Sequence, residues 1–288
     1  MVRVHCPEPR PRRSPGGWRR AALLLPVAAL AACSSPRPPS AAEPQVVRAT
    51  RSLFGATVAV SVTARDRGEV ERAQRSVLAA LGEARRVEDA MTAGGPLLAQ
   101  VGRTAGRPVD LPEDLFRLTT HALRLAELTG GAYDPTAGPV RELYANGRAP
   151  AAAALHARLA LVGAKQVRLT PRPPGFVGTV ALGRAGMTLE VDPLWRPYAV
   201  DRAAAHLAQS GIADFLVDAG TAAAARGAAP RGAWRVGVAD ASREGAWAAR
   251  LFLKDAGMAV AARPACPAAA ACPPPVDPRT GVPAAGLD

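Results

Sequence analysis

Thr129-Gly130-Gly131-Ala132-Tyr133-Asp134-Pro135-Thr136-Ala137-Gly138-Pro139-Val140 is the stretch of this sequence that decides the fold. It follows a segment with helical periodicity that begins at Pro112, a residue tolerated in the first turn of a helix. We predict a helix there, with a stop at Gly130-Gly131. The stretch would then lie on a turn at the end of a buried helix, with backbone amides free to meet a ligand. The predicted apolar face consists of Leu115, Leu118, Ala122 and Leu125.

The remaining pattern mixes strands and helices. Alternating valines at 58, 60 and 62 predict a strand, and an apolar stripe from Val70 through Ala84 toward Met91 predicts a helix. Further predicted helices cover residues 151–162 and 198–209, the second ended by Ser210-Gly211. Predicted strands cover residues 166–170, 177–182, 187–191, 215–217, 234–238 and 251–253, and the first three form a meander with a turn at 171–174. The sequence predicts a single α+β domain over residues 45–288.

The N-terminal segment has the layout of a bacterial export signal. Six arginines precede or flank an apolar run at 21–30 that is too short to span a bilayer. It closes on Leu30-Ala31-Ala32-Cys33, which looks like a lipobox. We therefore predict a signal peptide at 1–32, lipidation of Cys33, and a flexible Ser/Pro/Ala-rich tether at 33–44. The expected location is the cell envelope, anchored to a membrane and facing the exported side; a cleaved secretory signal or a misassigned start is the alternative.

Charge and motifs exclude several functions. The net charge of +12 comes almost entirely from scattered arginines, without the clustered basic and aromatic residues of a nucleic-acid surface. Nucleophile elbows, phosphate loops, H-E-x-x-H and G-x-G-x-x-G after a strand are absent from the sequence. The three histidines after the signal lie on predicted helices, where we expect packing or surface roles: His121, His156 and His206.

Two cysteines remain after the signal and the lipobox. Cys266 and Cys272 lie in a Pro/Ala-rich segment, and an exported pair is free to oxidise. We predict a disulfide between them rather than a metal site, because no other thiol and no nearby histidine completes a ligand set.

The opening stretch resembles the T-G-G-A-[FY]-D-P-T-x-G-P-L signature of the FAD:protein FMN transferase (ApbE) family. Three further motifs follow it in the family's order, and a fourth precedes it. Phe54-Gly55-Ala56 stands for M-G-T, and Phe215-Leu216-Val217-Asp218-Ala219-Gly220 for L-V-N-x-G-G. Glu190-Val191-Asp192-Pro193-Leu194-Trp195-Arg196-Pro197-Tyr198-Ala199-Val200-Asp201 stands for D-L-G-G-I-A-K-G-Y-A-V-D. Val276-Asp277-Pro278-Arg279-Thr280-Gly281 stands for the end of H-I-I-D-P-x-T-G.

This resemblance implies a flavin transferase fold and a reaction. The FMN half of FAD would pass to a Thr or Ser hydroxyl of an exported acceptor protein, with release of AMP and with magnesium offsetting charge on the pyrophosphate. Arg196 replaces a Lys or Glu of the family motif and would act as the catalytic cation, because its guanidinium can donate two hydrogen bonds to a phosphate. The residues implied at the cofactor are Phe54, Ala132, Tyr133, Asp134, Glu190 and Arg196.

Departures from the family pattern indicate an alternative to this function. Prolines at 193 and 197 replace residues of a glycine-rich turn, leaving the Pro193 carbonyl as the implied metal ligand. Pro274 replaces the motif histidine, and the segment with the family's metal-binding Asp and Thr is expected to be missing after residue 288. The alternative is a catalytically inactive descendant that binds FAD or a protein partner in the envelope; a truncated gene is another explanation.

Overall fold

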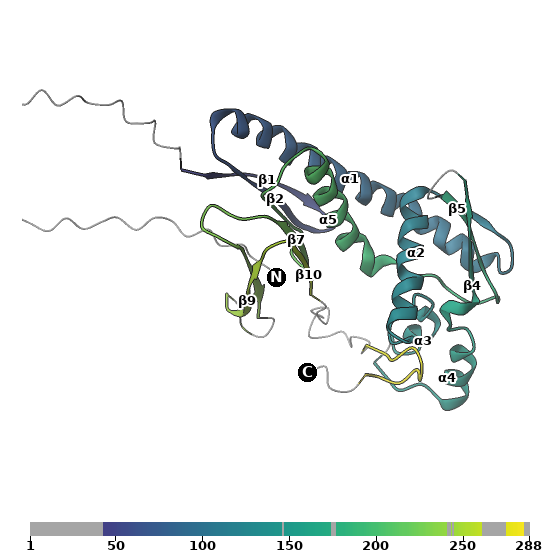
Figure 1. Ribbon diagram of the computed structural model, residues 1–288. Helices are drawn as coiled ribbons and strands as arrows, with labels where there is room; N and C mark the ends of the chain where they lie inside the picture. The colour runs from purple at the N-terminus through teal and green to yellow at the C-terminus, as the bar shows by residue number, and fades with distance from the viewer. Residues whose placement is uncertain are drawn as a thin grey trace, which may run out of the picture.

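A five-stranded antiparallel sheet forms one side of the molecule (Figure 1). The computed structural model describes residues 43–145, 147–173, 177–240, 243, 245–260 and 275–284. The sheet has the order β1-β2-β6-β7-β10. Its strands are β1 (Gln45–Leu53), β2 (Ala56–Ala64), β6 (Phe215–Asp218), β7 (Ala222–Arg226) and β10 (Ala256–Ala259).

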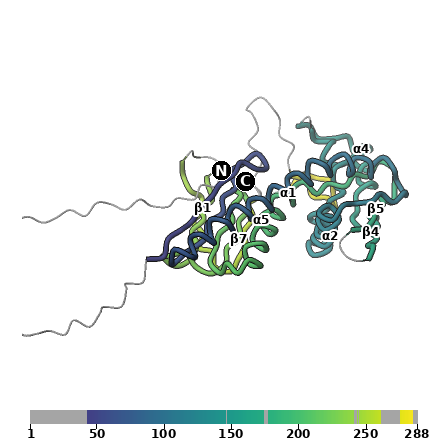
Figure 2. The backbone as a smooth tube through the Cα atoms, turned by 90° about the horizontal axis from the view of Figure 1, so that it is seen from above, coloured from purple at the N-terminus to yellow at the C-terminus, as the bar shows by residue number. Residues whose placement is uncertain are grey.

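Two helices cover this sheet. Helix α1 (Arg67–Arg103) begins at Asp66, whose side chain accepts a hydrogen bond from the Glu69 amide at 2.7 Å and so caps the helix. Helix α5 (Asp192–Gln209) packs along α1, and the two run side by side across the molecule (Figure 2). The apolar stripe of α1 meets the alternating valines of β2 in one buried core.

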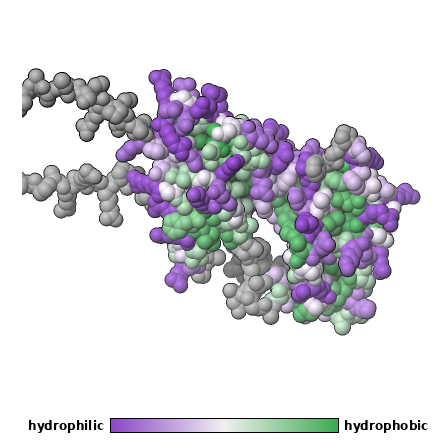
Figure 3. Space-filling view, viewed as in Figure 1, coloured by the Kyte–Doolittle hydropathy of each residue, from purple (hydrophilic) through white to green (hydrophobic). Residues whose placement is uncertain are grey.

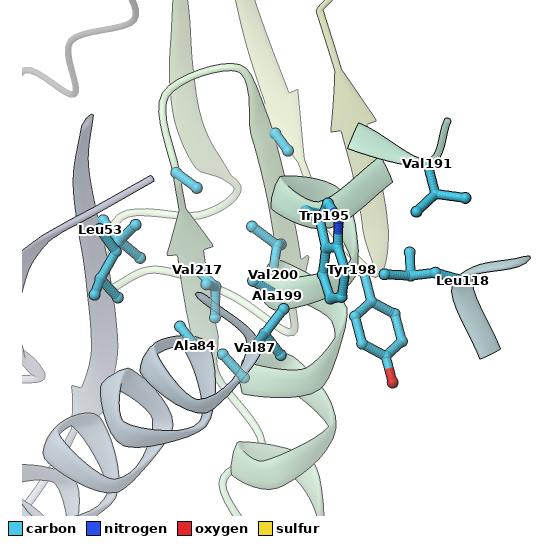
Figure 4. Packing of buried hydrophobic residues seen from close by; sticks show 14 of the residues in the cluster. Leu53, Ala84, Val87, Leu118, Val191, Trp195, Tyr198, Ala199, Val200 and Val217 are labelled. Atoms are coloured by element: carbon cyan, nitrogen blue, oxygen red, sulfur yellow. The ribbon is translucent and has the colours of Figure 1, made fainter. Parts of the chain in front are cut away.

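Trp195 anchors the core where α5 begins. Its side chain is 2% exposed and lies beside Tyr198 and Leu118, so α5 is fixed against both the sheet and α2 (Figure 4). A buried aromatic side chain of this size contributes several kcal/mol of packing, on the order of 3–5 kcal/mol when replaced by Ala. The first turn of α5 is therefore a well-anchored element.

The other side of the molecule carries α2 (Glu113–Leu128), α3 (Gly138–Glu142), α4 (Ala152–Leu159) and a three-stranded sheet of order β3-β5-β4 (Figure 1). Its strands are β3 (Val109–Leu111), β5 (Val177–Leu182) and β4 (Val167–Arg172), and the short helix η1 (Ala164–Gln166) precedes β4. A separate hairpin joins β8 (Trp234–Ala239) to β9 (Trp247–Leu253).

Most predicted elements are confirmed, and the α+β class is that of the structure. Residues 187–191 are an exception, because they form no strand. Their alternation of buried and half-exposed residues is real, yet the backbone meets the turn after α2 through the hydrogen bond from the Glu190 amide to the Pro135 carbonyl, 2.8 Å. The prediction that Leu125 belongs to the buried face is also wrong, since this residue is 36% exposed.

Helix α5 begins six residues earlier than the predicted start at residue 198. Pro193 lies in its first turn, where a missing N–H costs nothing, while Pro197 lies inside the helix. The predicted turn at 171–174 includes two residues, Pro171 and Arg172, that belong to β4 and pair with β5. The sequence pattern did not predict strands β1, β7 and β10, and β7 consists of four alanines and one arginine, a composition with weak strand preference.

Several predictions lie outside the described residues. These are the signal peptide, most of the tether, Cys33, Cys266, Cys272 and Pro274. Within the part of the chain that the structure describes, no helix combines the length and apolarity needed to cross a bilayer.

Candidate flavin site

The turn after α2 is closed by its own backbone. Gly130 and Gly131 adopt left-handed φ angles of 58° and 82°. Their amides donate to the carbonyls of Glu127 and Ala126, as in a helix C-terminal cap. The Tyr133 amide donates to Thr129 Oγ1 at 3.1 Å. The prediction that these amides are free to meet a ligand is therefore wrong, because the turn uses them.

Asp134 joins this turn to η1, just before β4. Its Oδ1 accepts from the Thr136 amide at 2.8 Å and from the Thr136 hydroxyl at 2.5 Å, while Oδ2 accepts from the Ala164 amide at 2.8 Å. Thr136 is fully buried and also accepts from the Gly163 amide at 2.7 Å. The carboxylate predicted to contact a cofactor thus serves first to hold two chain segments together.

Tyr133 points a polar group into the interior. Its hydroxyl is buried and finds no hydrogen-bond partner among the described residues. Burial raises the pKa of Tyr133 to about 12, with further contributions from Asp134, Glu190 and Asp192. The hydroxyl therefore stays protonated at neutral pH and can donate a hydrogen bond to a ligand.

Glu190 contacts this turn and the helix that follows it, through its backbone amide and its side chain respectively. Its amide is bound to Pro135, and its Oε2 lies 2.7 Å from Arg141 Nη2. A β-carbon on Gly138 would overlap Glu190 Oε1 and Thr188 Oγ1, so these side chains would have to shift if residue 138 were larger than glycine. Burial raises the pKa of Glu190, Arg141 opposes that rise, and Asp192 and Glu142 add to it.

A second group forms where β1 turns into β2. Phe54 has a φ of 53°, its amide donates to Glu88 Oε1, and its carbonyl accepts from Arg196 Nη2 at 2.8 Å. Arg196 Nη1 donates to Thr221 Oγ1 at 2.8 Å. Two of the five guanidinium N–H donors are thus engaged within the described part of the chain, which leaves three for a ligand.

Helix α5 links the two groups. Asp192, in its first turn, contributes to the potential at Tyr133, and Arg196 follows one turn later. Pro193 lies between them, and its carbonyl has no i+4 amide to meet because residue 197 is proline. Ala132, the remaining predicted cofactor residue, is exposed on the turn.

The motif near the C-terminus packs against the same turn. A β-carbon on Gly131 would lie 3.4 Å from Arg279 Cγ, and Tyr144 donates from its hydroxyl to the Gly281 carbonyl at 2.8 Å. Figure 1 shows this yellow segment beside α3 and α4. Arg279 pairs with Asp277 at 2.7 Å and lowers the pKa of that carboxyl to about 2. Asp277 is therefore bound within its own turn.

The surface is hollowed between the strand side and the α3 side of the molecule (Figure 3). Hydrophobic residues lie on the surface beside the hollow, on the face shown. Four residues of the site were not predicted from the sequence, because each contacts its partner only in the folded chain. They are Glu88, Arg141, Thr188 and Thr221.

Comparison with known proteins identifies the relatives of this chain. A family model described as the ApbE family matches residues 54–287. A FAD:protein FMN transferase of Treponema pallidum is 30% identical over 190 residues, covering 61% of this chain and 52% of that protein. One from Klebsiella pneumoniae is 28% identical over 228 residues, covering 76% of this chain and 64% of that protein. The chain thus spans between about half and two thirds of these curated relatives.

The fold has solved counterparts. The crystal structure of the ApbE protein from Thermotoga maritima superposes with a TM-score of 0.65 at 21% identity, covering 83% of this chain and 79% of that one. At this identity the likeness establishes the fold.

Proposed function

The chain belongs to the ApbE family, and from that premise we propose that it transfers the FMN half of FAD to a Thr or Ser hydroxyl of a protein acceptor, releasing AMP. The observation that carries this proposal is the buried hydroxyl of Tyr133, which has no hydrogen-bond partner among the described residues. A buried donor without an acceptor costs free energy, on the order of 1–3 kcal/mol, which a bound ligand can recover. Flavin rings carry carbonyl and ring-nitrogen acceptors that suit this donor.

Arg196 is the side chain that we assign to the phosphates. In the transfer, the acceptor hydroxyl loses its proton to solvent, its oxygen forms a bond to the FMN phosphorus, and the bond from that phosphorus to the oxygen of AMP breaks. Negative charge grows on AMP as it leaves. The remaining donors of Arg196 would offset that charge, while its bonds to Phe54 and Thr221 hold the guanidinium in place without cost at the moment of reaction.

Magnesium is the second ligand that the resemblance implies. Among residues 43–145, 147–173, 177–240, 243, 245–260 and 275–284, no group of three or more His, Cys, Asp or Glu side chains could hold a metal ion. The Pro193 carbonyl is one potential donor, and Asp277 is already paired with Arg279. The roles proposed for Tyr133 and Arg196 use side chains of this chain alone.

Export and anchoring complete the proposal. Lipidation of Cys33, with the tether at 33–44, would hold the domain at a membrane of the cell envelope on the exported side, where an exported acceptor is within reach. A disulfide between Cys266 and Cys272 suits that compartment. Mass spectrometry of the protein from native membranes would show a diacylated N-terminal cysteine; an unprocessed N-terminus would contradict the anchor.

A non-catalytic flavin-binding or protein-binding role is the second candidate, supported by the prolines at 193 and 197 that replace residues of the family's glycine-rich turn. The two are separated by incubating the purified protein with FAD and candidate acceptor proteins, with and without magnesium, and measuring AMP and acceptor-bound flavin by chromatography. AMP appearing in proportion to protein supports the transferase. FAD binding without AMP under either condition, in the presence of candidate acceptors, supports the second role.

A further inference from the structure

Arg141 is the side chain that holds Glu190. It belongs to α3, the five-residue helix directly after the signature turn, which is anchored by Val140 at 0% exposure. The Arg141 side chain is 54% exposed, and its Nη2 reaches Glu190 Oε2 at 2.7 Å. That separation is typical of a charge-assisted hydrogen bond. A residue with a fixed backbone and a solvent-facing head is suited to orient a neighbour at the rim of a site.

Glu190 needs such a partner because burial and acidic neighbours disfavour its charge. Its side chain is 26% exposed, and the acidic groups facing it are Asp192 from α5 and Glu142 from α3. Tyr133 faces it from the turn. Arg141 forms the ion pair that counters these acidic neighbours.

Glu190 also has one methylene more than the Asp of the family motif. The longer side chain has an additional rotatable bond, so its carboxylate has more positions to choose from. Gly138 leaves the space that Oε1 occupies, and the Thr188 hydroxyl beside it is without a partner among the residues that the structure describes. Arg141 selects one of these positions by binding Oε2.

We propose that Arg141 is a positioning residue that fixes the Glu190 carboxylate beside Tyr133 and thereby sets the affinity of this site for FAD. The inference rests on the proposed function. Flavin and ribityl groups offer N–H and O–H donors, and an oriented, ionised carboxylate is a strong acceptor for them. Arg141 thus acts through Glu190 and carries out no chemistry itself.

The test compares FAD dissociation constants across pH 5–9 for the unaltered protein, Arg141→Gln and Arg141→Lys. Arg158→Gln is the matched control, since Arg158 approaches Glu142 of the same helix at 4.0 Å. Losing one charge-assisted hydrogen bond weakens FAD binding by about tenfold in Arg141→Gln. Without the cation, Glu190 takes up its proton at a higher pH, so the acid limb of the binding profile moves toward neutral pH. Arg141→Lys retains most of the affinity, and Arg158→Gln matches the unaltered protein.

Two results overturn the inference and differ from each other. Equal dissociation constants and equal pH profiles for Arg141→Gln and the unaltered protein would remove the role of Arg141 and leave the flavin site intact. Failure of the unaltered protein to bind FAD at any pH would contradict the proposed function, and this inference with it.

Discussion

The Asp134 carboxylate accepts a hydrogen bond from the Ala164 amide at 2.8 Å, across 30 residues of chain. This contact ties the signature turn to the segment that leads into β4, and the Thr136 bonds to the same carboxylate close the turn on itself. An acidic residue that the motif implies at a cofactor thus holds two segments of the chain together.

Replacing Asp134 by Ala should lower the free energy of unfolding by about 2–3 kcal/mol, because the Ala164 amide and the Thr136 groups lose a buried acceptor. FAD affinity should fall with it. Chemical denaturation checks the first effect. Asp110→Ala is the control, since its carboxylate is exposed and pairs with Arg172 at the surface. A stable Asp134→Ala protein that has lost only FAD binding would show that the carboxylate contacts the ligand directly.

Gly138→Ala should weaken both folding and flavin binding, because the new methyl group would overlap Thr188 Oγ1 and Glu190 Oε1. We expect a loss of about 1–3 kcal/mol in the free energy of unfolding. Gly82→Ala is the control: it lies in α1 with nothing within 4 Å of the added carbon, and should be neutral or stabilising. Thermal unfolding that ranks the two variants in the opposite order would contradict the tight packing at Gly138.

Tyr133→Phe should separate stability from binding. The free protein loses no hydrogen bond that the described residues make, so its free energy of unfolding should stay the same or rise by about 1 kcal/mol. FAD affinity should fall, because the ligand loses a donor. Tyr144→Phe provides the contrast, since it deprives the Gly281 carbonyl of a buried partner and should destabilise the protein by about 1 kcal/mol. Unchanged FAD affinity in Tyr133→Phe would remove Tyr133 from the site.

Arg196→Lys should impair the protein although the charge is kept, because one ammonium group cannot reproduce the planar fork that meets Phe54 and Thr221 together. AMP release should fall by about tenfold or more if the remaining donors stabilise the leaving group. Arg202→Lys, on the same helix and 41% exposed, should match the unaltered protein. Equal AMP release by all three proteins would exclude Arg196 from the chemistry.

Asp218 should make the fold less stable as pH rises. It is 5% exposed, and burial raises its pKa despite the hydrogen bond from the Gly220 amide and the nearby Arg48. A carboxyl with a raised folded-state pKa contributes stability that is fully present below its unfolded pKa of 3.8 and is lost as pH rises through the folded value. Asp218→Asn, which restores the residue of the family motif, should remove this slope in unfolding experiments at a series of pH values from below 3.8 up to 8. A slope that persists in Asp218→Asn would assign it to other groups.

An element of the fold was predictable wherever its own sequence contains the residues that start or stop a helix, or the alternation typical of a strand. Pro112 and Gly130-Gly131 mark the two ends of α2, and the valines of β2 alternate with smaller residues as expected for a strand. Prediction failed where tertiary packing overrides local preference. Pro197 suggests a break, yet Trp195 fixes the helix around it, and the alanines of β7 become a strand only between β6 and β10.

The site was predictable only as far as its motifs. The resemblance implied that Tyr133 and Glu190 share a site. In the structure, burial is the main cause of the raised pKa of Tyr133, and the charges of Asp134 and Glu190 add to it. Arg141 could not be found in the same way, because an arginine on a short helix is usually solvated and only the fold brings it to Glu190. The engagement of Asp134 by Ala164 was hidden for the same reason.

The most direct test of this account is an equilibrium titration of the purified protein with FAD, followed by flavin fluorescence, with Tyr133→Phe measured alongside. We expect saturable binding of one FAD per chain, weakened in Tyr133→Phe by about tenfold, the value of one lost hydrogen bond to a buried donor. Absence of saturable binding by the unaltered protein, with or without magnesium, would show that the fold has outlived its flavin site.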